Sequence, residues 1–525
     1  MGVASRHAAR VVGVGAEVVQ APAPASAMLP QCVGMVGQAL DSLLPYDVTP
    51  TRIVSAAQAA ELYGLGSPLH RMAQIALPAS GGGLGGLPLT AYPILTDGAS
   101  VAAVGRINVS GATLREAIEV EVILGGISSG RYVAPAGTSR ILVVIVLAIV
   151  LAGIEELPML AAFDAGGVGL TSKTAGAVGN SMPIELVFHL GSADGSGLVF
   201  TVVPPTGGSG AQDVTPALTG IGARWETILI NGLNPEDDTA LQAYRAWGDE
   251  RWGAVEARPA VVVTGSRDPD IAAAVDVTLT HVDDRVNALV VLPGAGESPW
   301  AIAAAAAIEV ASIANENAPQ DYSRAPLVGL RVGAANAFFD YTARDASVRL
   351  GISTTELAEG VGVLSDMVTM YHVDEARVLS FFMACGEPLA LCGEALGGSV
   401  TLSSVFGEPI PSFRSVVDIM KLMNVIHRIR TVFESQGWRS APLLPGAQLA
   451  TNPAARKPRD AAADLASIVD GLAREAFIAD PVAAKRSIAA AVDSGDPKRL
   501  NVGLAVSLAG NANIRSVDLD FGFFN

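Results

Sequence analysis

Histidine is the side chain used most often as a general base or a metal ligand, so the six histidines of the chain are the first candidates for chemistry. They are dispersed as His7, His70, His189, His281, His372 and His427. His281 is near Asp283 and Asp284 in the sequence, and His372 is near Asp374. Neither has a second histidine four residues away, which is the spacing of a helical metal site. Capping or surface roles explain them better, so we expect no catalytic residue, no metal and no cofactor.

Residues 126–130 read G-I-S-S-G and match the elbow that holds the nucleophilic serine of α/β hydrolases. The pattern is short, and a chain with 56 glycines is expected to contain it by chance. Residues 131–133 (R-Y-V) do not start a helix, whereas the elbow leads directly into one. An ordinary β-turn is the better interpretation, and the sequence predicts that the protein is not an enzyme.

Three loops follow predicted strands at positions where an α/β protein would bind phosphate groups. These loops, at residues 231–238, 264–270 and 293–299, contain Asp237, Asp238, Asp268, Asp270 and Glu297. The carboxylates supply negative charge to the helix N-termini themselves and would repel a phosphate. Neither G-x-G-x-x-G nor G-K-[ST] follows any of these strands. An α/β enzyme or small-molecule carrier is the alternative function, and nucleotide-dependent thermal stabilisation would favour it.

Length and composition indicate a multidomain protein that buries surface against other subunits. The chain has 525 residues, of which 50% are hydrophobic and only 16% are charged, with a mean hydropathy of +0.41. An average soluble domain has about 25% charged residues, so we expect an obligate assembly. The 34 basic and 51 acidic side chains give a net charge of −17, which disfavours direct nucleic-acid binding through phosphate neutralisation.

The cysteines and the apolar segments argue for a cytoplasmic protein without stable membrane insertion. Cys32, Cys385 and Cys392 have no zinc-ligand spacing, and the last two are either buried small hydrophobes or a bridging pair. Arg6 breaks the myristoylation pattern, and the N-terminal residues do not form a signal peptide. Residues 141–152 are twelve apolar residues where a membrane span needs about twenty, so they predict a buried helix.

Alternating hydrophobic segments predict an α/β core. We expect strands at 226–230, 261–263, 288–292 and 327–332, and helices at 235–247, 271–279 and 300–314. Two consecutive β-α-β units imply a parallel sheet with right-handed crossovers. Earlier strands at 33–38 and 52–54 precede a helix capped by Ser55.

Other parts of the chain have a different pattern. Short alternating segments from about 106 to 210 indicate a mostly β insertion domain with one helix, and helices at 416–433 and 461–476 indicate an α+β C-terminal domain. The expected fold class is α/β, a parallel-sheet core with this insertion, this C-terminal domain and two extended terminal arms. The predicted divisions are 1–30, 31–105, 106–210, 211–395, 396–510 and 511–525.

Both chain ends have strand patterns with few local partners. Valines 11, 12, 14, 18 and 19 precede a proline- and alanine-rich linker, and an alternating strand is expected near residues 517–524. The side chains expected at subunit contacts are Val11, Val12, Val14, Val18, Val19, Val517, Leu519, Phe521, Phe523 and Phe524. Strand addition to a neighbouring copy would link subunits through main-chain hydrogen bonds, and head-to-tail contacts of this kind propagate as rings or helices. The alternative is that both arms fold back on their own subunit.

The chain resembles the Mu-like bacteriophage contractile tail sheath proteins over nearly its whole length. The matching segments include 62–67 (L-Y-G-L-G-S), 170–180 (L-T-S-K-T-A-G-A-V-G-N), 205–208 (P-T-G-G), 225–230 (W-E-T-I-L-I), 351–354 (G-I-S-T) and 367–371 (M-V-T-M-Y), followed by Asp496-Pro497. Their shared order carries the resemblance. One departure is the apolar, glycine-rich stretch 381–411, which is longer than the corresponding connection in the family.

This resemblance implies a structural sheath subunit that stacks as hexameric rings around an inner tail tube and contracts to drive the tube through the host envelope. It implies partners in the tube, baseplate and tail-terminator proteins, and a place in the virion tail after assembly in the host cytoplasm. The insertion domain would face outward, the C-terminal domain would lie nearest the tube, and the arms would connect subunits. A phage-derived tailocin sheath is a further alternative within the same resemblance.

Overall fold

The computed structural model describes residues 28–43, 47–79, 81, 83–194, 196–210, 212–253, 256–281, 284–371, 413–439, 441–446, 448 and 451–511. The chain divides into two compact units. The larger unit, here called the core unit, comprises residues 31–423 and 507–525. The smaller unit comprises residues 1–30 and 424–506.

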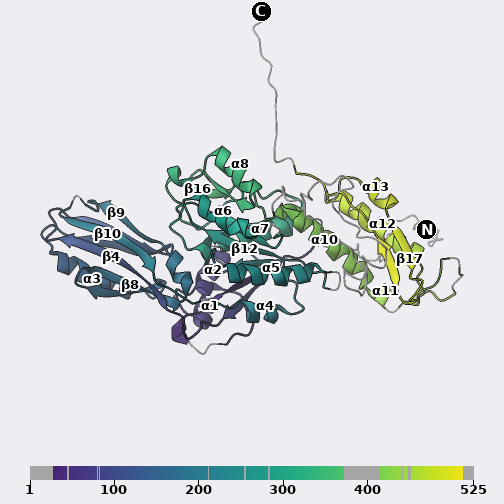
Figure 1. The fold of residues 1–525 in the computed structure, drawn as a ribbon, viewed down its shortest axis with the longest axis horizontal. Helices are drawn as coiled ribbons and strands as arrows, with labels where there is room; N and C mark the ends of the chain where they lie inside the picture. Colours follow the sequence, from purple (N-terminus) through teal and green to yellow (C-terminus); the bar gives the residue numbers. More distant parts are fainter. Residues whose placement is uncertain are drawn as a thin grey trace, which may run out of the picture. The chain divides into compact units, whose positions relative to one another are not determined.

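A seven-stranded mixed sheet forms the centre of the core unit (Figure 1). In chain order its strands are β1 (Val33–Gln38), β2 (Thr51–Ile53), β3 (Leu89–Ile94), β11 (Ile228–Asn231), β12 (Val261–Ser266), β13 (Asn287–Val291) and β14 (Ile352–Ser353). Their spatial order is β14-β13-β12-β11-β1-β3-β2, and every neighbouring pair is parallel except β2 with β3. All residues of β1, β11, β12 and β13 are buried, which explains their continuous hydrophobic runs.

Helices cover both faces of this sheet, as the β-α-β pattern predicts. Around the sheet lie α1 (Ala56–Tyr63), α2 (Pro68–Ala76), α4 (Thr215–Ile221), α5 (Asp238–Trp252), α6 (Ile271–Leu279), α7 (Pro299–Asn317) and α8 (Tyr341–Arg349). Helices α5 and α6 pack against Leu289 and Val291 of β13. Helix α7 packs on Gly265, which pairs with Val290 and therefore lies on the opposite face. The predicted Ser55 cap is present, accepting a hydrogen bond from Gln58 N at 3.1 Å.

The prediction of a strand at residues 327–332 is wrong, because the structure has no strand there. Gly329 has φ +80°, which breaks an extended strand, and Val328 is 61% exposed. Leu327 instead donates to the carbonyl of Gly362 in the hairpin of β15 (Thr355–Ala358) and β16 (Val361–Leu364). The short strand β14 adds to the parallel sheet in its place.

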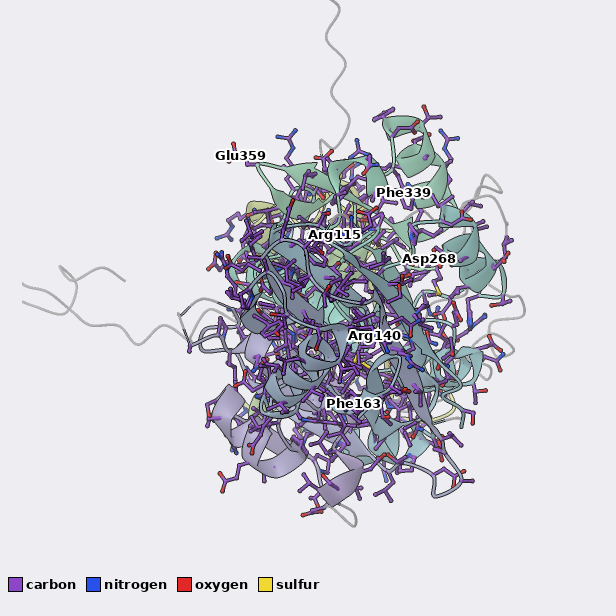
Figure 2. The ribbon with its side chains drawn as sticks, turned by 90° about the vertical axis from the view of Figure 1, so that its left-hand side faces the viewer. Arg115, Arg140, Phe163, Asp268, Phe339 and Glu359 are labelled. Carbon is purple, nitrogen blue, oxygen red and sulfur yellow. The ribbon has the colours of Figure 1, made fainter. Side chains whose placement is uncertain are left out.

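In the sequence, the segment between β3 and α4 forms an antiparallel part of the core unit. It consists of β4 (Ala102–Gly111), β5 (Ile118–Leu124), β6 (Ile127–Ala134), α3 (Arg140–Ala152), β7 (Met159–Asp164), β8 (Gly167–Ala175), β9 (Ile184–Leu190) and β10 (Leu198–Thr206). The strands form two sheets, ordered β10-β4-β8-β7 and β6-β5-β9 (Figure 1). Figure 2 looks onto this part, with Arg140 at the start of α3 and Phe163 on β7 on the near side. The predicted β-rich segment with one helix is therefore present.

Helix α3 is capped by Ser139, which accepts a hydrogen bond from Leu142 N at 3.4 Å. The sequence predicts a buried helix here, but only one face of α3 is buried. Leu147 and Leu151 are buried, whereas Ile141 is 55% and Ile149 is 66% exposed. A helix that lies on the surface of two small sheets can cover only one of its faces. Within the described residues no helix is both long and apolar enough to cross a membrane.

The smaller unit is α+β. Helix α10 (Val416–Phe433) has the predicted bounds, and the division between the units falls within it. It is followed by α11 (Gln436–Arg439), α12 (Pro458–Arg474), α13 (Pro481–Arg486), β17 (Ala489–Val492) and β18 (Leu500–Gly503). The core unit also contains three short 3-10 helices, η2 (Asp41–Leu43), η3 (Ala177–Ser181) and η4 (Ala335–Ala337).

Candidate assembly site

The side chains predicted to link subunits lie outside the described residues. They are Val11, Val12, Val14, Val18 and Val19 at one end, and Val517, Leu519, Phe521, Phe523 and Phe524 at the other. Cys385, Cys392 and the stretch 381–411 also lie outside. The role of the arms therefore stays a prediction, and the described residues can be searched for a surface that would accept a strand.

The sheet of β17 and β18 is the clearest such surface in the smaller unit. The two strands are antiparallel, with Ala490 opposite Val502 and Val492 opposite Leu500. These four side chains are half-buried, and helix α12 contacts both strands. Helix α12 buries one apolar stripe, formed by Ala461, Leu465, Ile468, Val469 and Leu472. The sheet is thus supported on one side by an amphipathic helix.

In the part of the chain that the structure describes, the other side and the outer edges of this sheet are open. The outward side chains are small, namely Ala489, Ala491, Asn501 and Gly503, and all four are exposed. Within the described residues the sheet has two strands, so each strand has an outer edge without a ladder partner. Two-stranded sheets are marginally stable alone, and exposed edges are templates for further strands. The arrangement can accept an extended segment through main-chain hydrogen bonds.

The turn between β17 and β18 is fixed by Asp493. Its carboxylate accepts hydrogen bonds from Gly495 N at 2.8 Å, Asp496 N at 3.0 Å and the Asn501 side-chain amide at 2.9 Å. The Asn501 amide, followed by these backbone N–H groups, lowers the pKa of Asp493 below its ordinary value. A charged Asp493 therefore stabilises the turn that sets the register between β17 and β18.

The carboxylates in the loops after the parallel strands have the roles that the sequence predicts. Asp237 caps α5 by accepting from Ala240 N at 3.1 Å, and Asp270 caps α6 by accepting from Ala272 N at 2.9 Å. Glu297 differs, because it is buried and pairs with Arg71 at 2.9 Å. Burial raises the pKa of Glu297, although Arg71 opposes this shift. These side chains therefore stabilise helix starts and the packing of the core unit.

The other candidates for chemistry are structural. The sequence predicts a capping or a surface role for His281. The surface alternative is wrong, because His281 is buried with Nε2 2.9 Å from Oδ1 of Asp238 in the first turn of α5. Ser128 and Ser129 lie in β6, and the tight turn before them uses Gly125 and Gly126 with positive φ, which excludes a nucleophile elbow. Among the described residues no cluster of three or more histidine, cysteine or acidic side chains could hold a metal.

Strand β17 was not predicted from the sequence. Its residues A-A-A-V have low strand propensity, and tertiary packing on α12 decides their conformation. A usable signal was the turn sequence S-G-D-P at 494–497, which stands directly before the alternating residues of β18. Val502, Leu504, Val506 and Leu508 alternate with other residues and by themselves predict a strand to residue 508, but β18 ends at Gly503.

Comparison with known proteins confirms the resemblance that the motifs predict. Over 202 residues the chain is 26% identical to the Mu-like prophage FluMu tail sheath protein of Haemophilus influenzae. The match covers 38% of this chain and 40% of that protein, so it spans less than half of the curated relative. No protein-family model matches the chain.

Two solved sheath proteins match most of the chain at low sequence identity. The sheath tail protein of Desulfitobacterium hafniense is 11% identical, with 94% of this chain and 100% of that chain covered and a TM-score of 0.44. The sheath tail protein of Listeria innocua is 10% identical, with 93% and 94% covered and a TM-score of 0.45.

Proposed function

We propose that this chain is a structural subunit of a contractile tail sheath, and that it polymerises as stacked rings around an inner tail tube. The observation that carries the proposal is the 202-residue likeness to a Mu-like tail sheath protein. The composition agrees, because a chain with only 16% charged residues needs other subunits to cover its surface. Its place would be the virion tail, with tube, baseplate and tail-terminator proteins as partners.

The open β17–β18 sheet supplies a chemical basis for linking the subunits. An arm strand from another copy would continue the ladder at one outer edge and gain main-chain hydrogen bonds. The expected strand near residues 517–524 alternates apolar side chains with Asp518, Asp520 and Gly522. Its apolar face would extend the half-buried face of Ala490, Val492, Leu500 and Val502, and its polar face would lie on the solvent side. A shift by one residue would reverse both faces, so this alternation also sets the register.

Contraction would use the arms as links between rigid bodies. The core unit has a central sheet in which strands β1, β11, β12 and β13 are completely buried, which suits a rigid body that reorients without internal change. Pro22, Pro24 and Pro30, with the small residues between them, would form one hinge. The stacked array would shorten and widen as the core units rotate, and this movement would drive the tube through the host envelope.

The proposal is tested by electron microscopy of the purified protein. We expect the full chain to form cylinders in solution. Deletion of residues 516–525 should abolish ordered cylinders while leaving a folded, soluble monomer with an unchanged circular dichroism spectrum. A second variant keeps the full length and replaces Phe521 and Phe523 by serine, which should also abolish ordered cylinders. The matched control replaces Asp518 and Asp520 on the expected solvent face by serine and should leave cylinders intact. Normal cylinders from the truncated chain would refute the linkage.

A further inference from the structure

A lysine on α10 holds the last described residues of the chain. Lys421 is completely buried, and its Nζ donates to three oxygens. These are Asp418 Oδ1 at 2.9 Å, the carbonyl of Ala509 at 2.6 Å and Asn511 Oδ1 at 2.5 Å. The Asn511 amide nitrogen in turn donates to the carbonyl of Pro319 at 2.8 Å. Asn511 is therefore tied by both ends of its side-chain amide.

This arrangement satisfies every donor of a buried ammonium group. An ammonium group has three N–H donors, and the three acceptors match that number. Burying such a charge is costly unless it is paired and hydrogen-bonded, so the site is stable only while residues 509–511 stay in place. Asp418 alone would leave two donors unsatisfied. If residues 509–511 moved away, the Lys421 ammonium group would lose two of its three acceptors. The free-energy cost of leaving these donors unsatisfied therefore opposes such a movement.

The path of the chain explains what this tie would do. The chain leaves the core unit at Asn424, forms the smaller unit, and returns to the core unit at Ser507. Strand β18 ends at Gly503, only a few residues before the return. It pairs with β17 over four residues. Pulling on the chain beyond residue 511 would peel β18 from this short hairpin unless the force is stopped first.

We propose that Lys421 is the anchor of the C-terminal arm, transmitting force from the arm into α10 and the core unit and protecting the β17–β18 sheet. The proposal rests on the proposed function for the source of that force, but the anchor itself is a property of the single chain. Lys421 is a positioning residue in this scheme, because it acts by holding residues 509–511 of its own chain. Residues 512–525 would then leave each subunit from one fixed point.

The experiment uses the full chain with two variants and one control. Lys421→Met removes the ammonium group and keeps an apolar side chain of similar length. Asn511→Ala removes the hydrogen bonds to Lys421 and to Pro319 but leaves the ammonium group with its other two acceptors, and so keeps the test valid if the first variant folds poorly. Lys485→Met is the control, because Lys485 pairs with Asp470 but is 39% exposed. Amide hydrogen exchange of residues 500–511 is measured by mass spectrometry, together with cylinder length by electron microscopy.

We expect exchange of residues 500–511 to rise at least about tenfold in both variants, since hydrogen bonds to charged groups are lost, while β12 and β13 and the control stay unchanged. Cylinders from the variants should be shorter or absent. Unchanged exchange at residues 500–511, or cylinders of normal length despite faster exchange, would overturn the anchor. Failure of the unaltered chain to form cylinders would instead contradict the sheath function, and the exchange result would still decide whether the anchor exists.

Discussion

The ion pair between the buried Arg428 of α10 and Glu475, the residue that follows α12, gives two predictions of different size. Arg428 is 1% exposed and pairs with Glu475, which is 40% exposed. Its guanidinium lies 5.0 Å above the Phe477 ring, and Gly471 leaves room for it on α12. Nε and Nη1 of Arg428 have no hydrogen-bond partner in the described part of the chain. Removing Glu475 leaves the buried charge of Arg428 without its ion-pair partner. Removing Arg428 instead removes that buried charge together with its two unsatisfied donors.

The expected magnitudes differ accordingly. Glu475→Ala should destabilise the smaller unit by about 2–3 kcal/mol, the value of a charge-assisted hydrogen bond to a buried partner. For a unit of this size, that corresponds to a fall of about 10–20 °C in the melting temperature. Arg428→Met should lie within about 1 kcal/mol of the unaltered protein, because an apolar side chain of similar volume replaces a buried ion at little cost.

Differential scanning calorimetry of the full chain measures both effects on the same transition. Glu434→Ala is the matched control, since Glu434 pairs with Arg430 on the same helix but is 64% exposed and should change the melting temperature little. If Arg428→Met melts at a lower temperature than Glu475→Ala, the reasoning about unsatisfied buried donors is refuted.

Three further outcomes are expected. Gly126→Ala should lower thermal stability strongly, because φ is +85° and a Cβ atom would lie 1.8 Å from Glu297 Oε2, whereas Gly130→Ala, with φ +70° and open space, should cost only about 1 kcal/mol; equal melting temperatures would contradict this. The lowered pKa of Asp493 means that its support for the β17–β18 turn is present above the ordinary carboxyl pKa and is lost as pH falls through the lowered value, so exchange in residues 489–503, corrected for intrinsic rates, should rise at acidic pH in the unaltered protein but not in Asp493→Asn. The net charge of −17 makes copies repel, so light scattering should show faster cylinder growth as salt rises from about 10 to 150 mM and the screening length falls from about 30 to 8 Å; slower growth would mean that attraction between charges drives assembly.

The sequence was sufficient for the α/β core because its elements have strong local patterns. The helices at Ile271–Leu279 and Val416–Phe433 have the expected bounds, since each has a long apolar stripe. Strands β12 and β13 were predicted from continuous apolar runs, which buried parallel strands require. Two-residue β14 was missed because so short a strand has no periodicity of its own.

The candidate assembly site was harder to predict, because long-range packing creates it. Three alanines in β17 do not favour a strand locally, and the packing of the sheet on α12 decides their conformation. The Lys421 anchor joins residues separated by 88 and 90 positions, and no local pattern of residue types marks such a contact. Its one local signal is a lysine at an otherwise apolar position of α10.

The finer division of the chain into six segments stays a prediction. The contacts divide the chain at residues 424 and 506, within the α10 helix and after β18. The expected boundary near residue 396 lies outside the described residues. Sequence patterns locate elements well, but they do not show which of two adjoining packed bodies a long helix belongs to.

Intermolecular cysteine crosslinking tests most directly whether an arm strand of one copy joins the sheet of another. Gly522→Cys, on the expected solvent face of the arm, is placed on one chain and mixed with Ala489→Cys or Ala491→Cys, on the exposed face of β17, on a second chain of different mass, in a background where Cys32, Cys385 and Cys392 are serine. Disulfides between the two chains, formed only under conditions that give cylinders, are the predicted result. A further variant carries both substitutions on one chain. If its disulfides form exclusively within single chains, and the mixed chains form none, the account is contradicted.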